Sequence, residues 1–135
     1  MMRLVLTTAG FLLLSTLSAC GSHELRSVSL TPASADARNF PSGQVPFVAT
    51  GIFTDSMSPV PLTSNEIFWC VGNNTGGCAG NINPGARLDQ NGLAQCNSGF
   101  SETVTILAGT QSSTMVNPDQ GPQLKVFGTA QLTCP

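Results

Sequence analysis

Residues 44–54 read QVPFVATGIFT, and this stretch decides the fold because its side chains alternate. Successive side chains of an extended strand point to opposite faces, so residues of one parity share a face. One parity is apolar or small throughout and should face a core: Val45, Phe47, Ala49, Gly51 and Phe53. Pro46 has no N–H to donate to a neighbour, so we expect the strand to start at a sheet edge or a bulge.

Shorter stretches of the same kind lie on both sides. We predict strands over residues 25–31, 62–71, 86–89, 93–97, 102–108 and 123–134. Residues 33–39 should cross over, residues 55–61 should form a turn, and residues 72–85 and 109–122 should form loops, because they are polar or rich in Gly, Pro and Asn. No long run has helical spacing. The chain therefore predicts an all-β fold, a β-sandwich of about seven short antiparallel strands.

Parity also assigns faces in the other strands. Trp69 shares a face with Ile67, so we expect it to be a core residue rather than a platform for a ligand, and Phe68 and Cys70 share the opposite face. The later residues expected to face the core are Val104, Ile106, Ala108, Leu124, Val126, Gly128, Ala130, Leu132 and Cys134.

The N-terminus is typical of a secretory signal peptide. Arg3 supplies a positive charge, residues 4–14 are apolar but too few to cross a bilayer, and residues 15–19 are small. The motif Leu17-Ser18-Ala19-Cys20 resembles the lipobox of bacterial lipoproteins. That resemblance implies cleavage before Cys20, a diacylglycerol on its thiol and an acyl chain such as palmitate on the new amine. The alternative is an ordinary signal peptide, after whose removal Cys20 would be half of a disulfide.

The chain therefore divides into a signal peptide (residues 1–19), a lipidated tether (residues 20–24) and one domain (residues 25–135). Its seven acidic and five basic residues form no basic patch, so nucleic acid is not an expected partner. A lipoprotein of this kind would sit on the bacterial cell envelope. In a host with two membranes we expect the outer one, since Gly21 rather than Asp follows Cys20.

Four pieces of the predicted domain occur in a familiar order. They are VSLTP (residues 28–32), QVPFVATG (residues 44–51), Trp69 and LDQNGLA (residues 88–94). Together they resemble the group 2 bacterial immunoglobulin-like domains, over residues 25–132. The resemblance implies an immunoglobulin-like sandwich. The four cysteines of the domain and the long Gly- and Asn-rich loop are departures from the family pattern, as is a single rather than a tandem domain.

With Cys20 lipidated, an even number of cysteines remains: Cys70, Cys78, Cys96 and Cys134. Two disulfides are expected, with three possible connectivities. No C-x-x-C motif occurs and the single histidine is His23, so zinc is not expected. In an immunoglobulin-like strand order the fifth and last strands end at one pole, which favours Cys70–Cys78 with Cys96–Cys134. Cys70–Cys96 with Cys78–Cys134 stays open, because the third strand also ends near that pole.

Residues that could carry chemistry are few. Asp55, Asp89, Asn91 and Asp119 lack the D-x-D-x-D spacing of a calcium loop and are typical of turns. A Ser-His-Asp site would need His23, which lies in the tether. Glu66 and Glu102 could form a carboxylate pair, although both start strands, where solvated acids are ordinary. Asn73-Asn74-Thr75 fits a glycosylation sequon but is interpreted as plain loop. We expect no catalytic residue, metal or cofactor.

Two functions fit these patterns. The first is a lipid-anchored, non-enzymatic module for adhesion, scaffolding or binding of another envelope protein, with residues 72–85 as the candidate surface. The second is a carbohydrate-binding or accessory module of an envelope enzyme. That function usually needs exposed aromatic side chains, and Phe68, Phe100 and Phe127 are the candidates.

Overall fold

A computed structural model describes residues 22–80, 85–112 and 121–135. The described chain is built from strands and two single turns of 3-10 helix, so the predicted all-β class is confirmed. In chain order the elements are β1 Leu25–Thr31, β2 Ser34–Asp36, η1 Ala37–Asn39, η2 Pro41–Gly43, β3 Gln44–Pro46, β4 Val48–Phe53, β5 Ser56–Pro61, β6 Phe68–Gly72, β7 Ala86–Leu88, β8 Leu93–Cys96, β9 Thr103–Gln111 and β10 Leu124–Thr133. In this part of the chain, no helix has the length and apolar character needed to cross a membrane.

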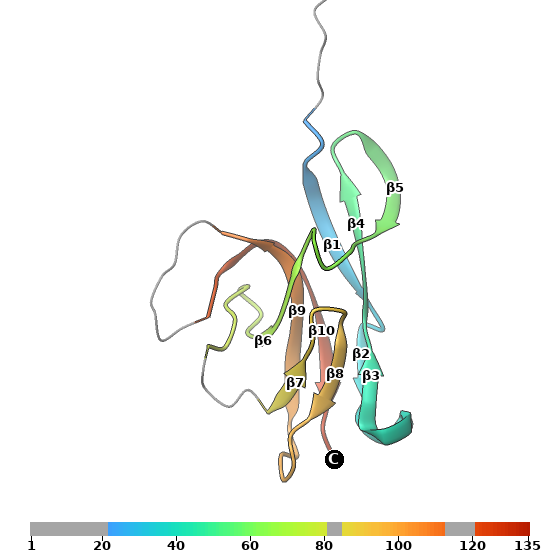
Figure 1. Ribbon diagram of the computed structural model, residues 1–135, viewed down its shortest axis with the longest axis vertical. Helices are drawn as coiled ribbons and strands as arrows, with labels where there is room; N and C mark the ends of the chain where they lie inside the picture. Colours follow the sequence, from blue (N-terminus) through green and yellow to red (C-terminus); the bar gives the residue numbers. More distant parts are fainter. Residues whose placement is uncertain (1–21, 81–84, 113–120) are drawn as a thin grey trace, which may run out of the picture.

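The strands form three sheets that enclose one main core. Their orders are β1-β4-β5, β2-β10-β9-β6 and β3-β8-β7. β9 and β10 are the long central strands, and the β4–β5 hairpin extends at the end of the molecule opposite the C-terminus (Figure 1). The arrangement is sandwich-like, with more strands than expected. Residues 44–54 divide into β3 and β4, and β2 and β5 form where a crossover and a turn are predicted.

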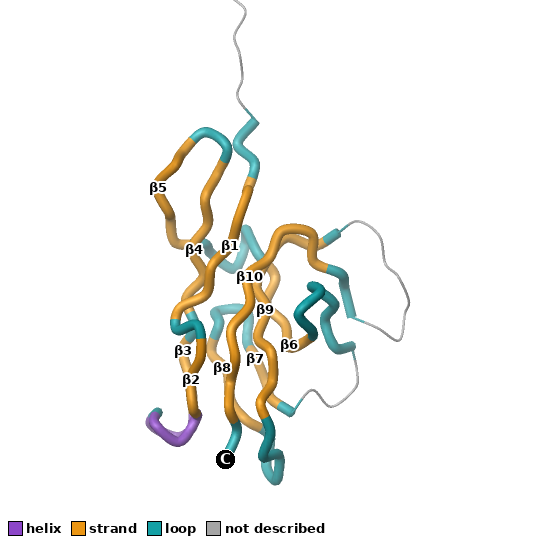
Figure 2. The backbone as a smooth tube through the Cα atoms, turned by 180° about the vertical axis from the view of Figure 1, so that it is seen from behind, coloured by secondary structure: helices purple, strands orange, loops and turns teal. Residues whose placement is uncertain are grey.

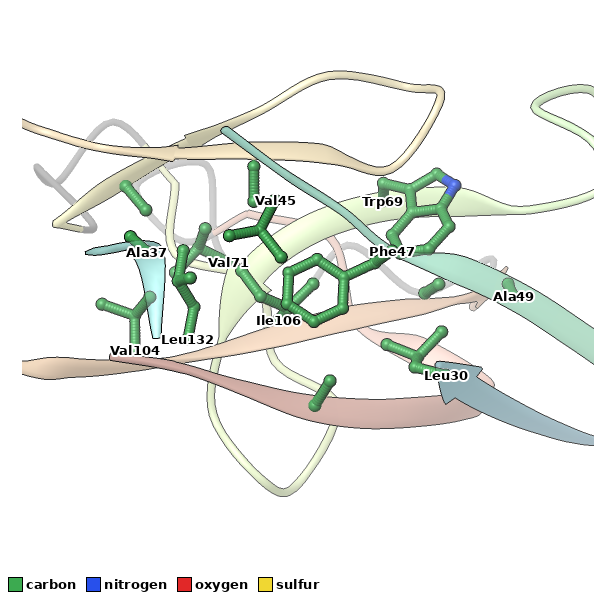
Figure 3. Packing of buried hydrophobic residues seen from close by; sticks show 14 of the residues in the cluster. Leu30, Ala37, Val45, Phe47, Ala49, Trp69, Val71, Val104, Ile106 and Leu132 are labelled. Atoms are coloured by element: carbon green, nitrogen blue, oxygen red, sulfur yellow. The ribbon is translucent and has the colours of Figure 1, made fainter. Parts of the chain in front are cut away.

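The stretch over residues 44–54 behaves as its alternation predicted, except that it divides. Its five residues of one parity, from Val45 to Phe53, are all buried. β3 pairs with β8 as the edge of its sheet, which explains how Pro46 is tolerated there. At Phe47 the chain leaves that sheet and enters the first one as β4, and the Phe47 ring points into the core (Figure 3).

The main core draws on all three sheets. Leu30 and Ala49 from β1 and β4 pack with Val45 from β3 and with Ile106 and Leu132 from β9 and β10 (Figure 3). Trp69 is 4% exposed and belongs to this cluster, so its predicted core position is confirmed. Burial of such side chains is the main source of stability for a domain of this size.

The predicted turn over residues 55–61 is wrong. Ser56–Pro61 forms β5, which pairs with β4 as the outer strand of the first sheet. Pro59 and Pro61 suggested a turn because proline cannot donate to a ladder, but an edge strand needs donors on one side only. The predicted strand over residues 62–71 is shorter than expected, because Thr63–Glu66 forms a turn and β6 begins at Phe68.

The predicted face of Leu124 is wrong, because a β-bulge precedes Val126. The register between β9 and β10 shifts between Leu124 and Val126, which places Leu124 on the opposite face from Ala130 and Leu132. There it packs with Leu107, Cys70 and Cys78 in a second, smaller cluster. A single extra residue reverses parity for everything before it.

Residues 33–39 cross over as predicted, and they add a strand on the way. After β1 the chain passes from the first sheet to the four-stranded sheet, where β2 pairs with Gln131–Thr133 of β10. This pairing is parallel, so the expectation of purely antiparallel strands is wrong at this one place among the described ladders.

Candidate functional site

The first described residues are bonded to the turn between β4 and β5. The Ser22 carbonyl accepts a hydrogen bond from the Thr54 hydroxyl. The Glu24 N–H donates to Thr54 Oγ1 at 3.1 Å, and the Thr54 N–H donates to the Glu24 carbonyl at 2.9 Å. From Ser22 onward, the predicted tether is therefore pinned to the domain.

The His23 side chain strengthens this attachment. Its Nδ1 lies 2.7 Å from Asp55 Oδ2, and its ring stacks on Phe53 with centroids 4.1 Å apart and planes inclined by 12°. The hydrogen bond with His23 lowers the pKa of the Asp55 carboxyl below its ordinary value. Phe53 is buried although it lies outside the main core, so the His23 ring serves as part of its cover.

β5, the outer strand of the hairpin next to this attachment, is exposed and carries no charge. Every residue of β5 after Ser56 is exposed, and Met57 is 96% exposed. Val60 adds a second exposed apolar side chain. No charged residue occurs between Asp55 and Glu66. The sequence pattern does not indicate this surface, because it predicts a turn over residues 55–61.

The four cysteines of the domain form the pairing that the expected strand order favours. Cys70 is joined to Cys78 and Cys96 to Cys134, with Cα atoms 5.7 Å apart in both disulfides. Cys70, Cys78 and Cys134 are buried. Cys96–Cys134 ties β8 to the end of the last strand, and Cys70–Cys78 folds the following loop back onto β6.

The described part of the Gly- and Asn-rich loop is more ordered than its composition suggests. Asn73 Oδ1 accepts hydrogen bonds from the Thr75 N–H, the Thr75 hydroxyl and the Gly77 N–H. The Cys78 N–H donates to the Pro122 carbonyl at 3.1 Å and the Ala79 N–H to the Val71 carbonyl at 2.7 Å. Residues 72–79 therefore cover the smaller cluster as part of the sheet. The described part of the predicted loop is therefore bonded to β6 and to the residues before β10, and Asn73 in the sequon is a structural residue.

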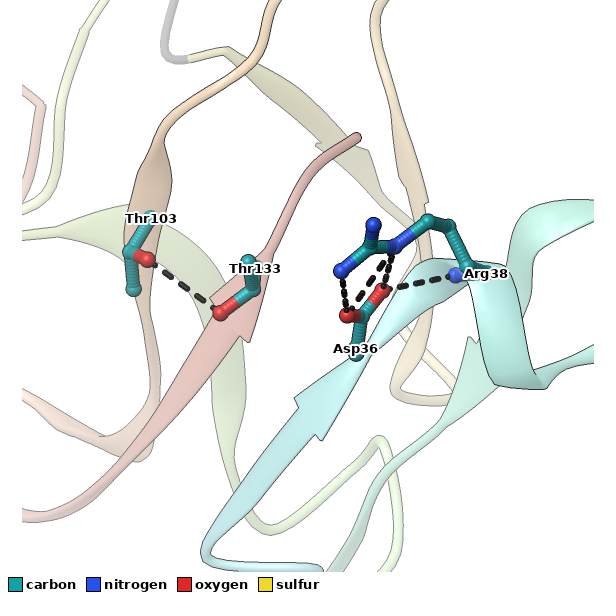
Figure 4. A network of polar contacts seen from close by, with 4 residues as sticks. All are labelled: Asp36, Arg38, Thr103 and Thr133. Carbon is teal, nitrogen blue, oxygen red and sulfur yellow. Dashed lines mark hydrogen bonds and ion pairs between the residues drawn. The ribbon is translucent and has the colours of Figure 1, made fainter.

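The opposite end of the molecule carries a polar network beside a groove. The Arg38 guanidinium binds the Asp36 carboxylate, and the Thr103 and Thr133 hydroxyls lie 3.2 Å apart on neighbouring strands (Figure 4). The hydrogen bonds from Arg38 lower the pKa of Asp36. A groove of about 320 Å³ is lined there by residues that include Arg38, Phe40, Cys96 and Pro135. Its charged side chain, Arg38, is already paired, so the groove offers no nucleophile with a base.

The other candidate residues are occupied in turns. Glu66 accepts hydrogen bonds from the Thr63 N–H and hydroxyl at 2.8 and 2.9 Å, which lower its pKa. Glu66 precedes β6, whose first residue pairs with Gly109, whereas Glu102 precedes the start of β9. The two carboxylates lie at opposite ends of β9, so the conceivable pair does not form. Asp89 accepts from the N–H groups of Asn91 and Leu93, as a turn residue does.

The described residues include no group of three or more His, Cys, Asp or Glu side chains placed to hold a metal ion. The candidate aromatic residues are not a platform either. Phe100 packs against the main core, and Phe68 and Phe127 pack against the smaller cluster. The predicted signal peptide, Cys20 and Asp119 lie outside the described residues.

The geometry therefore contains two features that sequence reasoning missed, the pinned N-terminal segment and the exposed hairpin beside it. The pinned segment depends on contacts between residues about thirty positions apart, which no local pattern encodes. The hairpin depends on the pairing of β5 with β4, which the two prolines of β5 do not suggest. Comparison of the chain with protein-family models, with curated proteins and with solved structures found no match in any of the three.

Proposed function

We propose that this protein is a lipid-anchored, non-enzymatic module of the bacterial cell envelope, with one immunoglobulin-like domain that binds or supports another envelope protein. The observation that carries the proposal is the lipobox followed at once by the domain. Cys20 stands two residues before Ser22, whose carbonyl already accepts a hydrogen bond from Thr54. An acyl group on Cys20 would attach the folded domain to a membrane with almost no spacer.

The sandwich supports a structural rather than a catalytic role. The Asp55 carboxylate is bonded to His23, the Glu66 and Asp89 carboxylates accept hydrogen bonds within turns, and the Thr103 and Thr133 hydroxyls bond each other across two strands. The Thr63 hydroxyl that donates to Glu66 belongs to the same exposed turn, together with the Thr63 N–H. One disulfide ties β8 to the residue after β10 and the other ties β6 to the loop that follows it, which suits a module exported to an oxidising compartment.

The carbohydrate-binding alternative has less support. Among the described residues the exposed large apolar side chains are aliphatic or Met: Val48, Met57, Val60 and Leu93. Glycan sites usually offer an aromatic face, and the candidate phenylalanines pack against one of the two clusters.

The test is to express the full chain in a bacterium and label it with an alkyne analogue of palmitate. We expect label and membrane fractionation for the wild type and neither for Cys20→Ala, with Cys70→Ala/Cys78→Ala as a control that keeps the lipobox. Membrane-bound, cleaved and unlabelled Cys20→Ala protein would contradict the anchor. Cross-linking in intact envelopes should then capture a protein partner. Retention on immobilised envelope glycans without such a partner would favour the alternative.

A further inference from the structure

The β4–β5 hairpin and the beginning of the described chain lie at the same end of the molecule, opposite the C-terminus. The backbone tube shows this arrangement from behind as well (Figure 2). The hydrogen bonds of Ser22 and Glu24 to Thr54 hold the chain against the hairpin turn. The position of the N-terminal segment relative to the hairpin is therefore set by the fold.

Met57 is the apolar side chain that this arrangement leaves in water. It follows the hairpin turn at Thr54–Asp55 by two residues and is 96% exposed. Met is long, flexible and polarizable, and such side chains are favoured where a surface must adapt to an irregular partner. The neighbouring residues of β5 are Ser, Pro and Val, so β5 itself carries no charge, and the adjoining Asp55 carboxylate is bonded to His23.

The chain length between Ser22 and Cys20 indicates what covers Met57. Two peptide units reach at most about 7 Å, so lipid on Cys20 would begin within that distance of the residue bonded to the hairpin turn. Three residues of strand from Thr54 to Met57 cover about 10 Å. These lengths, with the Ser22–Thr54 contact between them, keep Met57 within roughly 25 Å of Cys20, so a membrane that holds Cys20 lies within that distance of Met57.

We infer that the tip of the β4–β5 hairpin docks on the lipid surface that anchors the chain, with the Met57 side chain inserted among the acyl chains at the interface. This inference rests on the proposed lipidation of Cys20. It assigns the hairpin a second, non-covalent contact that fixes the orientation of the domain on the membrane, in addition to the covalent anchor.

The charges at the tip indicate how the hairpin would recognise the membrane. They belong to His23, Glu24, Arg26, Asp55 and Glu66, and the Asp55 carboxylate is already bonded to His23. Lys and Arg do not predominate among them, so attraction to anionic headgroups is not the driving force. Docking should therefore be equally strong on zwitterionic and on anionic bilayers.

The test uses the full lipidated protein, purified from membranes and reconstituted in phosphatidylcholine vesicles that contain doxyl-labelled lipid. Mass spectrometry first establishes the acyl chains. Met57→Trp places a fluorophore at the tip, and Ser98→Trp, an exposed site on the turn after β8, is the matched control. The buried Trp69 of the wild type supplies the background. We expect a shorter emission wavelength for Met57→Trp and at least threefold stronger quenching by shallow doxyl groups than for Ser98→Trp.

The outcomes separate the two proposals. An acylated protein whose Met57→Trp is quenched no more than Ser98→Trp overturns the docking and leaves the anchor intact. A protein that carries no acyl chain overturns both. A shift in emission without quenching means that Met57 is covered by protein, such as a second copy, and also overturns the docking. Quenching that appears only with anionic lipid contradicts the apolar mode of recognition.

Discussion

Gln90 and Trp69 are joined by two hydrogen bonds between one side-chain amide and one backbone unit. Gln90 Nε2 donates to the Trp69 carbonyl and the Trp69 N–H donates to Gln90 Oε1, both at 3.2 Å. β6 is the last strand of its sheet, and the amide takes the place of a further neighbour. The Ala79 N–H does the same for the Val71 carbonyl. These contacts close an edge that would otherwise be open to pairing with another chain.

Gln90→Ala should therefore destabilise the domain and expose this edge. Two partly buried backbone groups lose their partners, so we expect the free energy of unfolding to fall by about 1–3 kcal/mol. Urea denaturation measures the change, and light scattering near the midpoint should reveal association. Gln95→Ala, on an exposed position of β8, is the control and should stay within about 0.5 kcal/mol of the wild type. Equal stability of the two variants would contradict the proposed role of Gln90.

Two glycines have nearly the same φ angle but different surroundings. Alanine substitutions at these sites therefore distinguish the cost of the left-handed backbone from the cost of a steric clash. Gly92 has φ of 83° and Gly99 has φ of 78°. A Cβ at Gly92 would clash with the Phe47 carbonyl and approach the Trp69 ring to 2.8 Å, whereas a Cβ at Gly99 meets nothing within 4 Å. We expect Gly99→Ala to cost about 1–2 kcal/mol for the left-handed conformation alone. Gly92→Ala should cost about 1–3 kcal/mol more, because of the clash. Thermal unfolding of both variants measures the two losses of stability.

The two disulfides should differ in their contribution to stability. Cys96–Cys134 closes a loop of 38 residues and Cys70–Cys78 a loop of 8. In the chain-entropy description the first stabilises the fold by about 4 kcal/mol and the second by about 2.5 kcal/mol. Unfolding of the paired Cys→Ala variants measures both values. Non-reducing peptide mapping is the direct check, and a peptide that links Cys70 to Cys96 would contradict the pairing.

Asn73 should control the order of the loop that follows β6. Asn73→Ala removes three hydrogen-bond acceptor contacts, so the amides of Thr75 and Gly77 should exchange at least tenfold faster with deuterium. Asn74→Ala is the neighbouring control, because its side chain makes a single long contact with Thr105 at 3.5 Å. If the wild-type amides of Gly77, Cys78 and Ala79 already exchange as fast as free peptide, the loop is not pinned as described.

The contact between His23 and Asp55 should appear in a titration. Its hydrogen bond lowers the pKa of Asp55 from the ordinary 3.8, so the fold favours the deprotonated carboxylate. The stabilisation is then present above the unfolded pKa and is lost as the pH falls through the folded pKa. His23→Ala should raise the pKa of Asp55 toward its ordinary value in an NMR titration. The pKa of Asp36, which Arg38 lowers, should not change. A low pKa of Asp55 that persists in His23→Ala would refute this cause.

Local alternation predicted a large part of the fold. β1 has the predicted bounds, and the inward faces around Val45, Trp69 and Ile106 are correct, because the period of two is set by the strand itself. Such a period does not report which sheet a strand joins. The division of residues 44–54 at Phe47 and the crossing of β2 to β10 therefore had no signal in the pattern.

The misses share a physical cause. Pro59 and Pro61 predict a turn where β5 forms. A proline lacks an N–H for hydrogen bonds to a neighbouring strand, but β5 needs such bonds only on the side that faces β4. Leu124 changed faces through a bulge that is set by its pairing with β9. The candidate site at the N-terminal end depends on contacts of Ser22 and His23 with Thr54 and Asp55. The contacts of Ser22 and His23 are long-range, whereas β5 and Leu124 pair with strands that are near in sequence. In each case the outcome depends on the partner and not on the local pattern.

The parallel pairing of β2 with β10 has a mechanical consequence. A pull that separates Ser22 from Pro135 would draw the two strands past each other along their length, so the hydrogen bonds between Ala33–Asp36 and Gln131–Thr133 would be strained together rather than opened one after another. Beyond them, the Cys96–Cys134 bond transmits tension from the last strand into β8. The domain should therefore resist unfolding when tension is applied between Ser22 and Pro135.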